Sequence, residues 1–150
     1  MYHLLLYVHI VCAVTWVGGA FVIQLLAVRA EGSTDIAEIP RLARSVEAIG
    51  NRVFVPAATL LLLSGAAMTV SSWSFGQTWI ALAVALWVVS AVAGAVYIAP
   101  RVKQAVQLFD AEGPDSPRAR QLIGRMFLVS RIELASFAVI LALMVFKPSL

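Results

Sequence analysis

The chain has 150 residues, of which 61% are hydrophobic and 13% are charged. Soluble domains are usually about half apolar and a quarter charged, so this composition excludes an ordinary soluble protein and predicts an integral membrane protein. The net charge of +3 does not indicate a nucleic-acid partner, because the basic residues follow the pattern of a membrane topology. A single cysteine, Cys12, excludes an intrachain disulfide.

Four apolar blocks are each long enough to cross a bilayer, which takes about 20 residues of helix. They lie at residues 4–28, 53–70, 79–99 and 127–146. The chain is therefore predicted to be all-α, with a single polytopic four-helix transmembrane domain over residues 1–150.

The basic residues divide unevenly between the two ends of this bundle. Ten of the 11 lie in or beside the two long connections, residues 29–52 and 100–131, and only Lys147 lies at the other end. Connections with such an excess of Lys and Arg usually lie in the cytoplasm. The sequence thus predicts that both connections are cytoplasmic and that the N- and C-termini are outside.

The first block holds the most unusual pattern in the chain. His9 and Trp16 are seven residues apart and share one helix face to within roughly 20°, with Cys12 and Gly19 beside them. An imidazole, a large aromatic ring and bare backbone on one stripe indicate a surface that faces protein rather than lipid.

The connections also carry helix signals. Apolar residues at spacings of three and four over residues 36–49 predict an amphipathic helix on or near the membrane surface, which ends at Gly50-Asn51. Its apolar face is expected to cover the inner end of the bundle rather than to bind a partner. In the second block, Gly65 begins a Gly-Ala-Ala run that lets a neighbouring helix approach. Ser116 and Pro117 suit an N-cap and a first helical position, which predicts a fourth helix of about 30 residues.

Two charges fall inside the fourth block. Arg131 and Glu133 point about 160° apart, so they cannot pair on one helix face, and Arg131 is expected to reach the inner membrane surface. An unpaired carboxylate at the depth of Glu133 is costly. Glu133 is therefore predicted to face the bundle and to pair with Arg52 or Arg29, or to be protonated.

His9 admits three interpretations: a packing residue, a ligand of haem or metal, or a proton carrier. His3 is the other histidine and lies about 120° away on the same helix, so one chain cannot give one haem two histidine ligands. A haem on His9 is then five-coordinate, takes a thioether from Met68 or Met144, or lies in a homodimer. His9, Cys12 and the same methionines would instead suit Cu(I).

Part of this pattern resembles a known group of proteins. The matching residues lie on the first, second and fourth helices: His9, Trp16-Val17-Gly18-Gly19, Pro56-Ala57, Gly65, Arg131, Glu133 and Lys147-Pro148. The chain is similar to a four-helix family of small bacterial integral membrane proteins of unknown function. That family lies within a group that includes HemJ-type protoporphyrinogen oxidases and CopD-like copper-resistance proteins.

The resemblance implies a function for the first helix. In the HemJ-like enzymes the corresponding histidine is implicated in haem binding, which implies that His9 ligates a b-type haem in a bacterial inner membrane. The expected site consists of His9 on the iron with Trp16, Gly18, Gly19, Met68 and Met144 around it. The expected role is redox chemistry or haem handling, in a homodimer with an electron-transfer partner.

Other functions stay open. The HemJ-like enzymes have a lysine early in the third helix, where this chain reads Trp79-Ile80-Ala81-Leu82-Ala83, so protoporphyrinogen oxidation is not expected. One alternative is a copper or small-solute transport component that uses His9, Cys12 and the methionines. Another is a structural or interaction protein in which His9 and Glu133 only pack.

Overall fold

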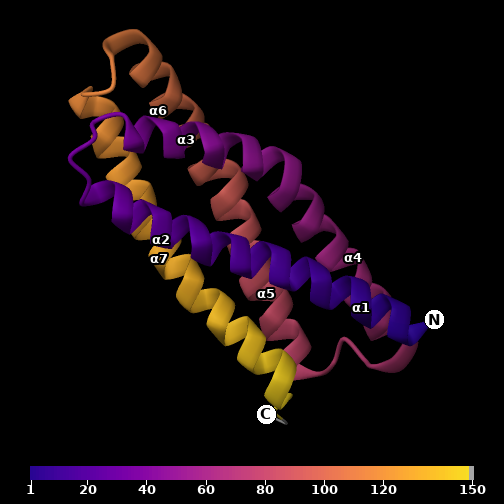
Figure 1. The fold of residues 1–150 in the computed structure, drawn as a ribbon. Coiled ribbons are helices and arrows are strands. Elements are labelled where there is room, and N and C mark those ends of the chain that lie inside the picture. Colours follow the sequence, from indigo (N-terminus) through magenta and orange to yellow (C-terminus); the bar gives the residue numbers. More distant parts are fainter. Residues whose placement is uncertain (149–150) are drawn as a thin grey trace.

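The computed structural model describes residues 1–148, and over this range the chain forms four long helices with short connections (Figure 1). Each of the first three helices contains a wider, π-helical turn. In chain order the segments are α1 (Tyr2–Ala13), η1 (Val14–Gly18) and α2 (Gly19–Glu31); α3 (Glu38–Ile49), η2 (Gly50–Phe54) and α4 (Val55–Ser72); α5 (Thr78–Val92), η3 (Ala93–Ile98) and α6 (Ala99–Glu112); and α7 (Pro117–Phe146).

All four helices are long and apolar enough to cross a membrane, which confirms the predicted all-α membrane architecture. The second and third helices have 35 residues each. At 1.5 Å per residue such a helix is about 50 Å long, whereas the hydrocarbon core of a bilayer is about 30 Å thick. These two helices are therefore longer than the hydrocarbon core requires.

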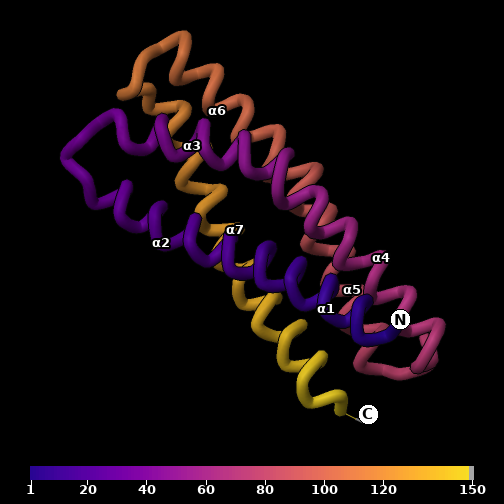
Figure 2. Tube along the Cα trace, turned by 45° about the vertical axis from the view of Figure 1, so that its right-hand side comes forward, coloured from indigo at the N-terminus to yellow at the C-terminus, as the bar shows by residue number. Residues whose placement is uncertain are grey.

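The two ends of the bundle differ in what they carry. The N-terminus and the end of α7 lie at one end, together with the turn over residues 73–77 (Figure 1 and Figure 2), and we call this the terminal end. Connections 32–37 and 113–116 lie at the opposite end. We call this the basic end, because the Arg- and Lys-rich segments are there.

The predicted surface helix over residues 36–49 is not a separate element, which corrects the expected stop at Gly50-Asn51. α3 continues through η2 into α4, because Gly50 keeps right-handed helical angles (φ −52°, ψ −54°). The apolar face of α3 packs on α6 and covers the basic end of the bundle. The amphipathic pattern is therefore confirmed as a helix, and its apolar face covers the end of the bundle, as expected.

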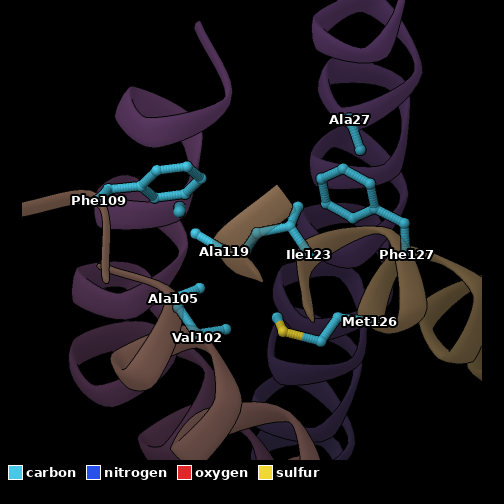
Figure 3. Close-up of a cluster of buried hydrophobic side chains, with 9 residues drawn as sticks. Ala27, Val102, Ala105, Phe109, Ala119, Ile123, Met126 and Phe127 are labelled. Atoms are coloured by element: carbon cyan, nitrogen blue, oxygen red, sulfur yellow. The ribbon is translucent and has the colours of Figure 1, made fainter. Parts of the chain in front are cut away.

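A core of small and aromatic side chains fills the basic end (Figure 3). It consists of Ala27, Ala43, Val102, Ala105, Phe109, Ala119, Ile123, Met126 and Phe127. The predicted start of α7 is confirmed beside it, since Ser116 Oγ accepts a hydrogen bond from the Ala119 N–H at 3.3 Å and Pro117 follows the cap. Ion pairs at this end, such as Arg44 with Asp110 at 2.6 Å, are exposed, and each contributes at most about 1 kcal/mol.

Reporter fusions are expected to place the terminal end outside the cytoplasm. Both termini share one end of the bundle, and ten of the 11 basic residues lie toward the other. A reporter enzyme that is active only outside the cytoplasm should therefore be active when it is fused after residue 150. A reporter that is active only in the cytoplasm should be active when it is inserted at residues 113–116. Activity of the opposite kind at either position would reverse the orientation.

Candidate functional site

The ring of His9 on α1 is held against α4 by two hydrogen bonds. Its Nδ1 lies 3.0 Å from the carbonyl oxygen of Leu61 and 3.2 Å from Oγ of Ser64. The Ser64 hydroxyl itself points to the Leu60 and Leu61 carbonyl oxygens, at 2.7 and 3.1 Å, so its oxygen is available to accept. Both partners of Nδ1 are acceptors, which assigns a proton to Nδ1; in the neutral ring this leaves a lone pair on Nε2.

That second ring nitrogen, Nε2, has no hydrogen-bond partner among the described residues. A metal-ligating histidine usually donates its other N–H to a backbone carbonyl or carboxylate, which fixes the tautomer and the ring. His9 has this arrangement, with Leu61 as the outer partner. The ring of His9 is therefore a neutral imidazole in a fixed orientation, and the lone pair on its Nε2 is free to bind a metal.

Gly65 is the reason that α1 and α4 can approach so closely. A Cβ at Gly65 would lie 3.0 Å from Cε1 and 3.4 Å from Nδ1 of His9, which is tighter than about nine in ten real Cβ contacts. The Gly-Ala-Ala run was predicted to admit a neighbouring helix, and the structure confirms it. The group that it admits is the imidazole itself.

Two adjoining cavities meet at His9. The larger has a volume of about 530 Å³, opens toward the terminal end and is almost wholly apolar; its lining includes His9, Gly18, Met68 and Met144. The smaller, of about 160 Å³, is also lined by His9 and Met144 and has Trp16 in its wall. Five of the six residues predicted around a cofactor thus border one or both of these cavities.

The sixth predicted residue, Gly19, lies elsewhere. A Cβ at Gly19 would come within 2.6 Å of Cε1 of Phe54, so this glycine serves the contact between the first two helices. The π-helical turn η1 accounts for the difference. A wide turn takes up about one extra residue, which rotates everything after it by about 100° relative to an uninterrupted α-helix. That rotation brings Gly18 toward the face of His9 and turns Gly19 away.

Cys12 and His3 do not join the site. Cys12 is buried in a cluster with Trp16, Ala57, Leu61 and Phe137 and lines neither cavity. His3 is exposed and also lines neither. Within residues 1–148 there is no group of three or more His, Cys, Asp or Glu side chains that is arranged to hold a metal ion.

Trp16 is packed between two other rings. Its ring centroid lies 4.8 Å from that of Phe137 and 6.3 Å from that of Trp87. These contacts, worth about 1 kcal/mol each beyond area burial, fix the wall of the smaller cavity. The indole Nε1 of Trp87 is buried without a hydrogen-bond partner in the described structure.

The predicted ion pair of Glu133 is corrected by the structure. Arg131 instead reaches Glu31 at the end of α2, with 3.2 Å between the charged atoms, and Arg29 lies 3.6 Å from Glu38. No ion pair of Glu133 or of Arg52 occurs within the described range. Acidic residues next to the helix ends are within easier reach of these arginines than a carboxylate deeper in α7.

Four further residues were not predicted to belong to the site. Ser64 supports His9, Trp87 borders the smaller cavity, and Lys147 borders the larger. Gln24 is only 8% exposed, and neither its Oε1 nor its Nε2 has a partner in the described residues. Two of the four gave a signal in the sequence: Gln24 is a lone amide in an apolar block, and Lys147 is the one basic residue at its end of the bundle.

Comparison with known proteins assigns the chain to a family. A family model described as "Predicted integral membrane protein (DUF2269)" matches residues 3–148, which is nearly the whole chain. No curated protein and no solved structure matches it. The match agrees with four membrane-spanning helices whose connections are short. The chain is therefore an integral, multi-pass membrane protein and belongs to the DUF2269 family.

Proposed function

We propose that the larger cavity binds b-type haem, with Nε2 of His9 as a ligand of the iron. The observation that carries this proposal is the state of His9: its Nδ1–H is committed to Leu61 and Ser64, and its Nε2 has no partner. A polar nitrogen with no partner in an apolar membrane cavity is costly, unless a ligand completes it.

The residues around the cavity fit a large, flat, apolar group. The volume of about 530 Å³ lies within the usual range of small-molecule sites, roughly 300–1,000 Å³. Gly18 leaves open space, since a Cβ at this position would meet nothing within 4 Å. The tetrapyrrole faces would contact aliphatic and thioether side chains, while the imidazole provides the one strong ligand.

Met68 and Met144 border the same cavity from α4 and α7, and the thioether of either could serve as a second protein ligand of the iron. A second histidine from another subunit is therefore not needed to complete the coordination, and the homodimer becomes a separate proposal. Bound haem would supply one-electron redox chemistry. The protein itself would fix the imidazole and exclude water with apolar side chains. It would also place the site near the terminal end of the bundle.

Titration of the purified protein with haem b in detergent tests the proposal. We expect a Soret band of protein-bound haem that saturates at one haem per chain, and the spin state will report whether a thioether completes the coordination. A protein that leaves the spectrum of free haem unchanged would contradict the proposal. Retention of Cu(I) without a Soret band would instead support the copper alternative through His9 and the two methionines.

A further inference from the structure

Lys147, directly after α7, is held in a defined position beside the larger cavity. It has left-handed backbone angles (φ 44°, ψ 55°), which non-glycine residues rarely adopt, and its N–H donates to the Leu143 carbonyl oxygen at 3.0 Å. This cap turns the chain at the end of the helix. The side chain of Lys147 is thereby directed over the rings of Trp73 and Trp79 rather than left free at a frayed end.

The indole rings of Trp73 and Trp79 hold the ammonium group of Lys147 by cation–π contacts. Nζ of Lys147 lies 4.5 Å from the ring centroid of Trp73 and 5.8 Å from that of Trp79. The two rings meet edge to face, with centroids 5.4 Å apart and an angle of 88° between the planes. Contacts of a cation with aromatic faces fix its position without neutralising its charge. All three side chains line the cavity that also contains His9.

No acidic side chain within the described range pairs with Lys147. The acidic residues lie in the links and helix ends of the basic half or, for Glu133, within α7. Lys147 is also the one basic side chain outside the basic half. The rim of an apolar cavity thus carries a fixed positive charge that no acidic side chain of residues 1–148 neutralises, which favours an anionic group on whatever occupies the cavity.

We propose that Lys147 binds a carboxylate of the cavity's ligand, so that a carboxylated tetrapyrrole is held at two points, by His9 on the metal and by Lys147 on the acid group. This inference rests on the proposed haem site and adds its selectivity for an acidic porphyrin. The spacing suits an extended ligand: Gly65 touches His9, and α4 ends at Ser72, seven residues or about 10 Å further along.

Equilibrium titrations with haem b and with its dimethyl ester, in which both carboxylates are neutral, test the inference. The wild-type protein should bind haem b about tenfold more tightly than the ester, as expected for one hydrogen bond to a charged group. Lys147→Gln should lose this preference by weakening only haem b, and Lys147→Arg should keep it. Lys103→Gln removes an exposed lysine from α6 and is the matched control, with no change expected.

The outcomes separate the two proposals. Equal affinity of the wild-type protein for haem b and its ester would overturn the role of Lys147 and leave the haem site intact. Binding of neither compound would overturn both. The wild-type comparison needs no substitution, so it decides the question even if Lys147→Gln does not fold.

Discussion

His9→Ala is expected to lower the haem affinity by more than about 100-fold and to remove the Soret band at micromolar protein, while the protein still inserts and folds. Loss of an outer partner of a metal-bound histidine already costs roughly 10–100-fold in affinity, so loss of the ligand itself should cost more. Alanine is readily tolerated in a membrane helix. The band and the yield of folded protein are measured on the same purified sample.

His3→Ala is the matched control, because it removes the other histidine of the same helix from an exposed position away from both cavities. Its Soret band should be unchanged. Free imidazole should restore part of the band in His9→Ala, since it can occupy the space that the ring has left. An unaltered spectrum in His9→Ala would show that the histidine only packs α1 against α4.

Gly18→Leu and Gly19→Leu are expected to fail in different ways although the two glycines are adjacent. A side chain at Gly18 enters open space in the larger cavity, so haem binding should be lost while stability is retained. A side chain at Gly19 meets the ring of Phe54 at 2.6 Å, so the bundle should lose about 1–3 kcal/mol from overpacking. The gain in helix propensity is the same for both and cancels in the comparison.

Thermal unfolding in detergent and haem titration of both variants measure this difference. Phe54→Ala should restore stability to Gly19→Leu and should have no effect on the haem deficit of Gly18→Leu. The opposite assignment, with Gly19→Leu stable and unable to bind haem, would mean that the first helix is rotated relative to the structure described above.

The membrane architecture was predictable because it depends on properties that are local in sequence. Apolar block length gives the number of helices, and residue types such as Ser116 and Pro117 mark where α7 begins. The continuity of α3 with α4 was not predictable from local signals. Gly50 resembles a helix stop, yet it keeps helical angles in a helix whose apolar face packs on α6, and that contact is not local in sequence.

The candidate site was predictable only in part, for a geometric reason. His9 stood out because a histidine is rare in an apolar helix, and Met68 and Met144 followed from their depth. Gly19 was wrongly placed because a helical wheel assumes 100° per residue across η1. The partners of His9 are Leu61 and Ser64. Which residues of α4 face His9 depends on the rotation of α4 about its own axis, and the sequence of α1 does not determine that rotation.

The π-helical turns also bear on how this molecule can change over evolutionary time. In the first two helices they occur where these helices touch, at Val14–Gly18 and Gly50–Phe54. Each turn changes the rotation of its helix, so the face that packs in the terminal half is set independently of the face that packs in the basic half. Drift in the packing of one half therefore need not be matched in the other. The cavity beside His9 and the extensions at the basic end can diversify as separate modules of one continuous set of helices.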